Sequence, residues 1–314
     1  MDKNLPVPVE TVDQIIKESI RQEEALLGID GDLLDATFVP RGFVYCNLPY
    51  RRLWRPDGTL ETLYEQKSAR LTLTLFCGDR SVGLPYGSMP RMLMSEITQR
   101  ARQSGSRKIY LAEPISHLFA RWGIPANGGP RGSISRFRLQ LDALCASAIH
   151  FSWHAKQIEG GKTIRTFDKI CNTPIFENAA FIREQIELNP TTLTDECYFE
   201  LSDYFFKEIT NHPVPIKLDA LAKLQRSPLA MDLYCFLTHR VSFIQTATLL
   251  DWTFLFKQFG SGFSDLRFFK RNFIRAIQKV IEVYPSLNVE PHPEGLLVKP
   301  CRPHVWRATD YGAQ

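Results

Sequence analysis

Six basic or amide side chains gather on one side of a helix that the sequence predicts over residues 265–284. They are Arg267, Lys270, Arg271, Asn272, Arg275 and Lys279, and Ser264 is the predicted N-cap before them. At about 100° per residue, the three arginines form one row opposite the apolar side. Like charges four residues apart repel, so a merely solvated face usually includes glutamates. Arginine side chains bind phosphate oxygens and guanine edges, and we therefore predict a DNA-contacting helix. An exposed basic face without a partner is the alternative.

A second helix is predicted directly after a glycine-rich bend, in the stretch GGPRGSISRFRLQLDAL at residues 128–144. Its polar flanks carry Arg131, Ser133, Ser135, Arg136, Arg138 and Gln140. Arginine and glutamine can bind base edges, and serine can bind phosphate or a base. A glycine bend before a helix can also hold nucleotide phosphates, but no phosphate-binding glycine motif is present. We predict a second DNA-contacting helix, with a solvated helix face as the alternative.

Two predicted β-hairpins carry further cations. Lys162 and Arg165 lie in the first hairpin, and Lys299 lies at the end of the second. Such hairpins often touch backbone phosphates next to a DNA-binding helix, a contact that does not depend on base sequence. Ordinary solvent-facing strand residues are an equally open interpretation.

Candidate catalytic and metal-binding groups are sparse. His150 and His154 have the i, i+4 spacing of a metal pair on a helix, but their segment is predicted as a strand. The seven cysteines are widely spaced without a C-x-x-C pair, which argues against a zinc site or a disulfide framework and fits the reducing cytoplasm. No nucleophile elbow or paired-carboxylate motif occurs. We expect no enzyme activity, no cofactor and no metal.

The charge distribution supports a polyanionic partner. Residues 1–40 hold three basic and nine acidic residues and so carry a net charge of −6. Because the whole chain has a net charge of +4, residues 41–314 carry a net charge of +10. A basic body behind an acidic segment favours binding to a nucleic acid. With 314 residues and 44% hydrophobic residues, the chain suits two globular domains. It contains no apolar stretch long enough for a membrane span and no signal peptide, so we expect no membrane partner.

The elements that must position these side chains follow one order in the first half of the chain. Strands are predicted at 43–45, 70–75 and 108–111, helices at 90–103 (with Ser88 as N-cap), 115–122 and 133–144, and a hairpin at 149–153 and 164–167 around a turn at 160–161. Helix, strand, helix, bend, helix and hairpin is the order of a winged helix, which is a helix-turn-helix with a β wing.

The second half repeats this order without a clear repeat of the letters. Helices are predicted at 218–224, 229–238, 252–259 and 265–284, a strand at 241–244, and a hairpin at 286–289 and 295–299. Further elements are a helix at 10–28, a strand at 185–188 and a helix at 201–209. We expect an α+β fold of two tandem winged-helix domains, at 41–175 and 213–314. A connecting segment at 176–212 joins them, and an acidic helical segment at 1–40 precedes them.

Several of these residues resemble a known family. The matching pieces are Leu84-Pro85-Tyr86-Gly87, Pro90-Arg91, the strand at Arg107–Leu111, Trp122-Gly123-Ile124 and Gly128-Gly129. Over residues 69–155 the chain resembles the plasmid-encoded RepA replication initiators of broad-host-range plasmids. The likeness is looser through the second half, where the winged-helix pattern carries it.

The resemblance implies a function. Such initiators bind directly repeated sites (iterons) in double-stranded DNA at a plasmid origin and open it with host replication proteins. They bind as monomers, with dimers inactive or repressing, and their C-terminal domain dominates sequence recognition. Two other functions remain open. One is a transcriptional repressor built on the same domains, and the other is an enzyme acting on DNA, such as a nickase.

Overall fold

The structure of the protein is a computed structural model that describes residues 36–68, 71–111, 113–159, 162–180 and 197–305. The predicted helix at 10–28 and the strand at 185–188 lie outside these ranges. The described helices are α2 (Arg41–Tyr45), α3 (Ser88–Ser104), α4 (Ile115–Arg121), α5 (Ser133–Cys145), α7 (Asp203–Asn211), α8 (Leu218–Lys223), α9 (Pro228–Val241), α10 (Trp252–Phe259) and α11 (Leu266–Val283). Within the described ranges, no helix is both long and apolar enough to cross a membrane.

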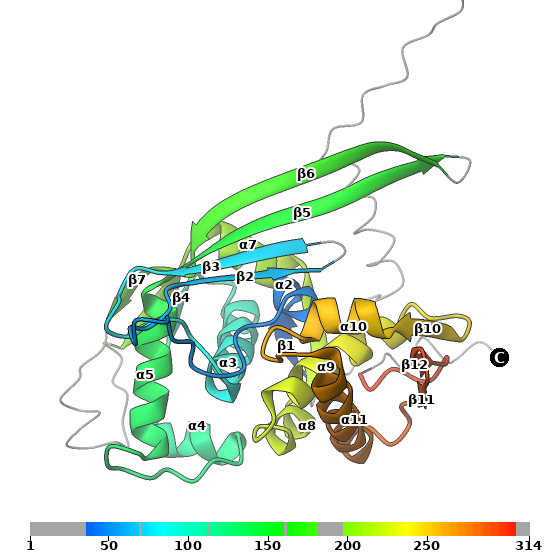
Figure 1. Cartoon of the computed structure of the whole chain (residues 1–314). Helices are drawn as coiled ribbons and strands as arrows, with labels where there is room; N and C mark the ends of the chain where they lie inside the picture. Colours follow the sequence, from blue (N-terminus) through cyan, green and yellow to red (C-terminus); the bar gives the residue numbers. More distant parts are fainter. Residues whose placement is uncertain (1–35, 69–70, 112, 160–161, 181–196, 306–314) are drawn as a thin grey trace, which may run out of the picture.

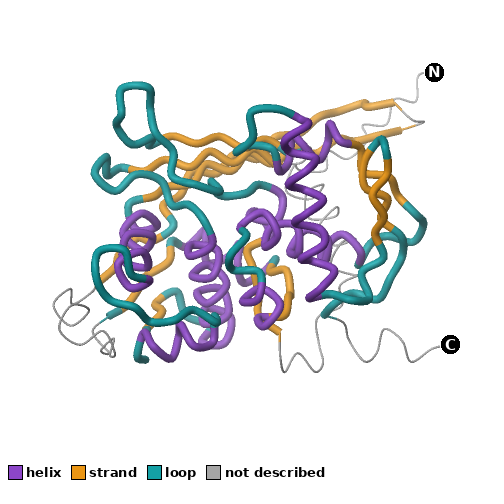
Figure 2. Tube along the Cα trace, turned by 60° about the horizontal axis from the view of Figure 1, so that its bottom comes forward, coloured by secondary structure: helices purple, strands orange, loops and turns teal. Residues whose placement is uncertain are grey.

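The strands of the described ranges form four small antiparallel sheets. They are β1 (Ala36–Pro40), β2 (Leu63–Lys67), β3 (Leu71–Cys77), β4 (Lys108–Tyr110), β5 (Ser147–Glu159), β6 (Lys162–Pro174), β7 (Phe176–Ala180), β8 (Tyr198–Leu201), β9 (Pro213–Lys217), β10 (Thr248–Asp251), β11 (Val289–His292) and β12 (Gly295–Val298). In Figure 1 the sheet β2-β3-β5-β6 lies above α3 and α5, and Figure 2 shows most helices on one side of the long strands. The fold is therefore α+β, as the sequence predicts.

The second half of the chain forms a three-helix unit with a β wing. Its elements follow the order α9, β10, α10, α11, β11 and β12, and its strands form one sheet in the order β10-β12-β11. The apolar side of α11 is buried through Phe269, Phe273, Ile277 and Val280. This spacing of i, i+4, i+8 and i+11 is the amphipathic pattern that predicted the helix. The expected winged-helix order is confirmed in this half.

The first half has the predicted order of helices and hairpin, but the strand between its helices does not pair with the hairpin as it would in a winged helix. Its elements are α3, β4, α4, α5 and the hairpin β5–β6. The hairpin pairs with β3 through β5, whereas β4 pairs with β8 from the segment between the two halves. Helix α7 of that segment packs against α3. The first unit is therefore like a winged helix in order, while its sheet recruits strands from outside the unit. The domain bounds given above stay a prediction.

Two short predicted strands are wrong. Residues 43–45 lie in α2, where Gly42 lets the chain pass so close to Phe151 that a Cβ would stand 2.8 Å from its ring. Residues 241–244 begin with the buried end of α9, and the strand of this region is β10, further along the chain. A short apolar run fits the buried side of a helix end as well as it fits a strand, so its type depends on what covers it.

The first hairpin is much longer than its apolar pattern indicates. Strands β5 and β6 have 13 residues each and pair along their whole described length, with a register shift between Gln157 and Ile158. The predicted strands covered only the parts with clear apolar alternation. Ladder hydrogen bonds carry the pairing through the polar residues beyond them, and composition gives no signal for that extension.

The two halves are joined by a sheet and by buried polar contacts. Strand β1 pairs with β9, so residues before the first unit lie against the start of the second. The Nδ2 of Asn47 donates to the carbonyl of Gln258, and Gln66 Nε2 donates to the carbonyls of Lys257 and Gln258 at 2.8 and 2.9 Å. These bonds satisfy carbonyls in the last turn of α10, which its own helix leaves unpaired.

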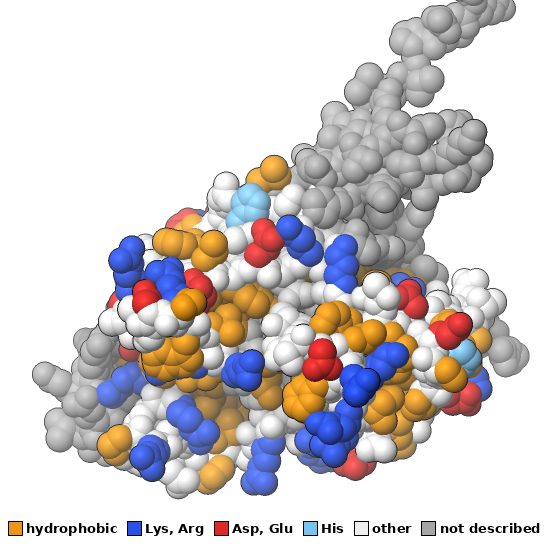
Figure 3. Space-filling model, in the orientation of Figure 1, with side chains coloured by type: hydrophobic (Ala, Val, Ile, Leu, Met, Phe, Trp, Pro, Cys, Tyr) orange, Lys and Arg blue, Asp and Glu red, His pale blue; other side chains and the backbone are white. Residues whose placement is uncertain are grey.

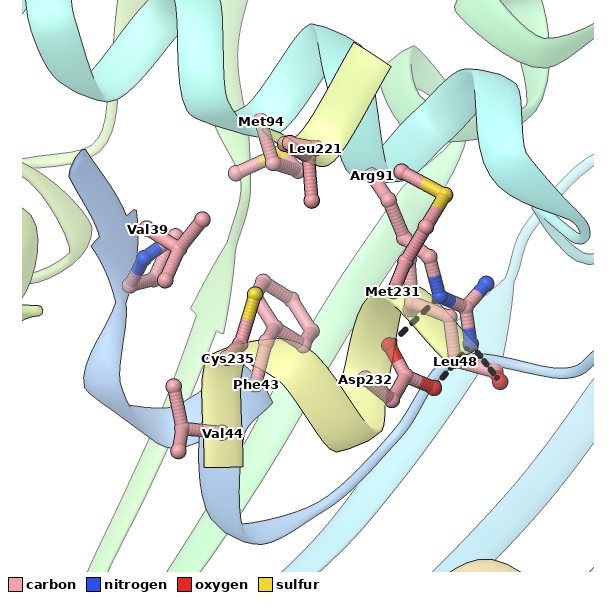
Figure 4. A pocket seen from close by; sticks show the side chains of 11 residues that line it. Val39, Phe43, Val44, Leu48, Arg91, Met94, Leu221, Met231, Asp232 and Cys235 are labelled. Atoms are coloured by element: carbon pink, nitrogen blue, oxygen red, sulfur yellow. Dashed lines mark hydrogen bonds and ion pairs between the residues drawn. The ribbon is translucent and has the colours of Figure 1, made fainter. Parts of the chain in front are cut away.

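A buried ion pair links α3 to α9 beside a small pocket. Nε and Nη2 of Arg91 donate to the two carboxylate oxygens of Asp232, both at 2.7 Å, and Figure 4 shows the groups facing each other. The same guanidinium donates to the carbonyls of Leu48 and Gly87. Burial opposes the charge of Arg91, but the Asp232 carboxylate more than offsets this and raises the pKa of the guanidinium. The adjoining cavity measures about 30 Å³, enough for a water molecule and far too small for a nucleotide.

Candidate nucleic-acid interface

Helix α11 presents its arginine row to solvent. Arg267, Arg271 and Arg275 are all exposed, on the side opposite the buried phenylalanines. Among the described residues, no carboxylate lies within ion-pair distance of any of the three. Figure 3 shows Lys and Arg side chains gathered over this helix, with others spread across the same face towards α5. The row is thus an exposed positive surface whose guanidinium groups form no ion pair among the described residues, which suits phosphate binding.

Aromatic rings support two cations of this helix. The guanidinium of Arg271 lies 4.9 Å from the ring centre of Phe268, and Nζ of Lys270 lies 5.0 Å from that of Trp252. Phe268 is 44% exposed and packs on Phe263. Cation–π contacts restrict where these long side chains point, which holds their charges on one surface.

The remaining predicted residues of α11 differ in availability. Lys279 is exposed, whereas Asn272 is partly buried and its Nδ2 donates to the carbonyl of Phe268 one turn earlier. Ser264 is not the N-cap. Asp265 caps the helix, because its carboxylate accepts the N–H of Phe268 at 2.8 Å. This hydrogen bond lowers the pKa of Asp265, which keeps a negative charge at the helix N-terminus.

Two of the side chains predicted on α5 are buried and cannot contact DNA in this structure. Ser133 Oγ donates to the carbonyl of Pro125 at 2.6 Å and accepts the N–H of Asn127. Gln140 is 3% exposed, and its Oε1 accepts the N–H of Tyr86 at 2.7 Å. Both hold neighbouring loops onto the helix. We therefore remove them from the set of DNA contacts.

The other four candidates of this helix lie at or near the surface. Arg131 and Arg136 are exposed, and no described carboxylate pairs with either. Ser135 donates to the carbonyl of Gly129 in the preceding bend. Arg138 is partly buried. The exposed cations here are therefore Arg131 in the preceding bend and Arg136 in the first turn of α5, a smaller set than that of α11.

The cations predicted on the two hairpins differ in what the structure shows of their side chains. Lys162 and Arg165 belong to β6, but their side chains lie outside what the structure describes. Lys299 forms an ion pair with Glu290 of β11, so its charge is partly compensated within the second hairpin. A phosphate contact from Lys299 would have to compete with that carboxylate.

The segment from Tyr50 to Arg55 carries cations that are absent from the predicted set of DNA contacts. Arg51 is exposed, and Trp54 beside it is 59% exposed. These residues belong to no periodic pattern, so helix or strand periodicity gives no signal for them. The only available signal was the local combination of arginines with a tryptophan in the string YRRLWR.

Comparison with known proteins gives a family and a related fold. The family model described as plasmid encoded RepA protein matches residues 84–253, more than half of the chain. The crystal structure of domains 2 and 3 of RctB is similar at 12% identity with a TM-score of 0.52, covering 85% of this chain and 99% of that one. Another crystal structure of RctB domains 2–3 has 11% identity and a TM-score of 0.48, covering 82% and 96%. No curated protein matches the chain.

The structural likeness and the family match support different conclusions. At 12% identity, the likeness to the RctB domains concerns the fold alone. The family match contains the Leu84–Gly87 bend, α5 and its preceding glycines, whereas α11 lies beyond its end. The match includes the residues on which the sequence resemblance was based. The chain belongs to the family of plasmid-encoded RepA proteins, which are plasmid replication initiators.

Proposed function

We propose that the protein binds repeated sites in the double-stranded DNA of its plasmid origin and helps to open that origin with host replication proteins. The observation that carries this proposal is the exposed arginine row of α11, which forms no ion pair among the described residues, within a winged-helix unit. A helix of this kind reads base edges in the major groove, while neighbouring cations hold the phosphates. The family match supports a role at an origin rather than at an unrelated site.

The two helices contribute unequally in this proposal. Helix α11 supplies Arg267, Arg271 and Arg275 and acts as the main reader. Helix α5 supplies Arg136, the bend before it supplies Arg131, and together they act as the partner of α11 on a neighbouring stretch of DNA. Because every phosphate contact releases counterions, the affinity falls steeply with salt, with a slope of about 0.9 per phosphate on logarithmic axes.

Cleavage protection on the plasmid's own origin tests the proposal. The full chain is titrated onto an origin fragment and onto a shuffled fragment of equal length and composition. We expect regularly spaced protected stretches on the origin fragment alone, in register with its direct repeats. Equal protection of both fragments would show a non-specific DNA binder, and no protection of either would overturn duplex binding.

We also propose that the protein acts without covalent chemistry on DNA. After incubation with supercoiled plasmid and denaturation, we expect no protein joined to the DNA and no increase in nicked circles. A tyrosine–DNA adduct would contradict this and identify a nickase. The same reaction with the origin deleted from the plasmid controls for contaminating nucleases.

A further inference from the structure

The loop between α2 and β2 lies against the start of α11. The ring of Tyr50 is 6.4 Å from that of Phe263, and a Cβ on Gly262 would stand 3.2 Å from Tyr50. Phe263 in turn packs against Phe268 and Phe269 in the first turn of α11. Residues that follow Tyr50 in the chain therefore emerge beside the N-terminal end of the arginine row.

The same loop is tied to the chain segment that reaches α5. Nη2 of Arg52 donates to the carbonyl of Val82 at 3.5 Å. A few residues later, the N–H of Tyr86 donates to Gln140 of α5 at 2.7 Å. Figure 1 shows α5 at the left edge of the molecule and α11 near its lower centre. The loop thus occupies the space between the two helices that are proposed to contact DNA.

The surface of this loop is basic and aromatic. Arg51 is exposed, and no described carboxylate pairs with it. The guanidinium of Arg52 lies 5.3 Å from the ring centre of Trp54, which is 59% exposed. Arg80 is exposed on the neighbouring turn. A cation stacked on an indole at the surface is a common device of nucleic-acid-binding proteins.

The acidic groups of these two loops are engaged within their own turns. Asp57 accepts the N–H and hydroxyl of Thr59, and Asp79 accepts those of Ser81. Glu61 pairs with Arg55. Among the described residues of these loops, Arg51, Arg52 and Arg80 therefore have no carboxylate partner, and Arg52 is held by the carbonyl of Val82 and the ring of Trp54.

We infer that the loop of Tyr50–Arg55 is a third DNA contact, in which Arg51 binds a backbone phosphate between the sites of α5 and α11 and Trp54 lies against the sugar–phosphate backbone. This inference rests on the proposed duplex binding and extends it. A phosphate contact is independent of base sequence. The loop therefore contributes affinity and fixes the spacing between the two helices, while α11 supplies the specificity.

The test uses the full chain with Arg51→Gln and two 40-base-pair duplexes, one from the plasmid's own origin and one shuffled. We expect Arg51→Gln to lower the affinity for both duplexes by the same factor, roughly five- to tenfold at 0.1 M salt, and to reduce the logarithmic salt slope by about 0.9. Lys207→Gln, on α7 in an ion pair with Asp203, is the matched control and leaves both quantities unchanged. Arg51→Glu, which reverses the charge, strengthens both effects.

A second measurement follows Trp54 directly. Iodide quenches exposed tryptophan, and the difference between wild type and Trp54→Phe isolates this side chain from the others. We expect the origin duplex to protect Trp54 from iodide. Unchanged salt slope and affinity in Arg51→Gln and Arg51→Glu, with Trp54 still accessible in the complex, would overturn the inference while leaving the proposed function intact. Failure of the wild type to bind either duplex would overturn the proposed function and this inference with it.

Discussion

Arg271 lies at the centre of the arginine row and is the side chain best placed to read a base. It is exposed, free of a described carboxylate and held over the ring of Phe268. Arg267 and Arg275 lie one turn away on either side. A guanidinium that is already oriented loses less side-chain freedom on binding, which favours a specific contact over a diffuse one.

We expect Arg271→Ala to weaken binding to the origin duplex by about 1–3 kcal/mol and to reduce the preference over a shuffled duplex. Fluorescence anisotropy titrations with both duplexes measure the two quantities. Lys207→Ala, far from the row on α7, is the control for a lost surface charge. Equal affinity of Arg271→Ala and wild type for the origin duplex would contradict a reading role.

Gln140 was predicted to contact a DNA base edge, but in the structure it has a structural role. Its amide oxygen accepts the N–H of Tyr86, so Gln140→Ala leaves a backbone donor without its acceptor. We expect a loss of about 1–3 kcal/mol in the free energy of unfolding and an unchanged salt slope of DNA binding. Urea unfolding and salt titration measure these effects.

Arg136→Ala on the same helix is the matched comparison for Gln140→Ala. It should leave the free energy of unfolding unchanged and reduce the salt slope. If Gln140→Ala instead changed base preference without loss of stability, Gln140 would return to the DNA interface. The helix spacing was predictable from the sequence, but the burial of Gln140 was not, because a loop some 54 residues earlier in the chain covers it.

At the scale of elements, the start of α11 depends on one aspartate. Both Ser264 and Asp265 are good N-cap types, and the prediction of Ser264 is wrong by one residue. The structure has the chain in extended conformation at Asp265, whose carboxylate reaches the N–H of Phe268. Ser264 instead donates to Asp265 at 3.3 Å. Sequence type alone cannot separate two adjacent caps, because backbone angles decide which side chain reaches the third N–H.

We expect Asp265→Ala to lower the Tm at pH 7, while Ser264→Ala changes it little. The folded state lowers the pKa of Asp265, so its contribution is present above the unfolded value of about 3.9 and is lost as the pH falls through the lower folded value. The Tm difference between Asp265→Ala and wild type should therefore shrink between pH 5 and pH 3. Thermal melts by circular dichroism measure it, and a larger effect from Ser264→Ala would reverse the assignment.

Sheet pairing is the element-scale feature that the sequence could not supply. Helices α3, α4, α5, α10 and α11 were predicted to within a few residues, because each has an amphipathic period and a stop signal. The partner of β4 was not predictable, because a three-residue strand carries no information about which edge it joins.

At the scale of the whole molecule, the two halves are coupled through Arg91 and Asp232. This buried guanidinium donates to the Asp232 carboxylate of α9 and to the carbonyls of Leu48 and Gly87. Removing one partner leaves the other charge buried and unpaired, which costs far more than the loss of an exposed pair.

We expect Arg91→Met to reduce the free energy of unfolding by about 3–5 kcal/mol, and Arg91→Met with Asp232→Leu to be less destabilised than Arg91→Met alone. Lys207→Met breaks an exposed ion pair and should cost at most about 1 kcal/mol. Urea unfolding followed by tryptophan fluorescence and circular dichroism gives these values. A double variant as unstable as the single one would show that the lost carbonyl contacts, rather than the unpaired carboxylate, determine the cost.

The pairing of β1 with β9 also has a consequence during synthesis of the chain, because β1 is made long before its partner strand. The two strands begin almost 180 residues apart. At roughly 5–20 residues per second, the ribosome needs about 10–35 s to reach β9 after it has made β1. Through that interval β1 has an open edge, and the side of α3 against α9 is uncovered. Until the second half has been synthesised, these uncovered surfaces of the first half can associate with other chains. Early binding of a chaperone to residues 36–104 would therefore be advantageous.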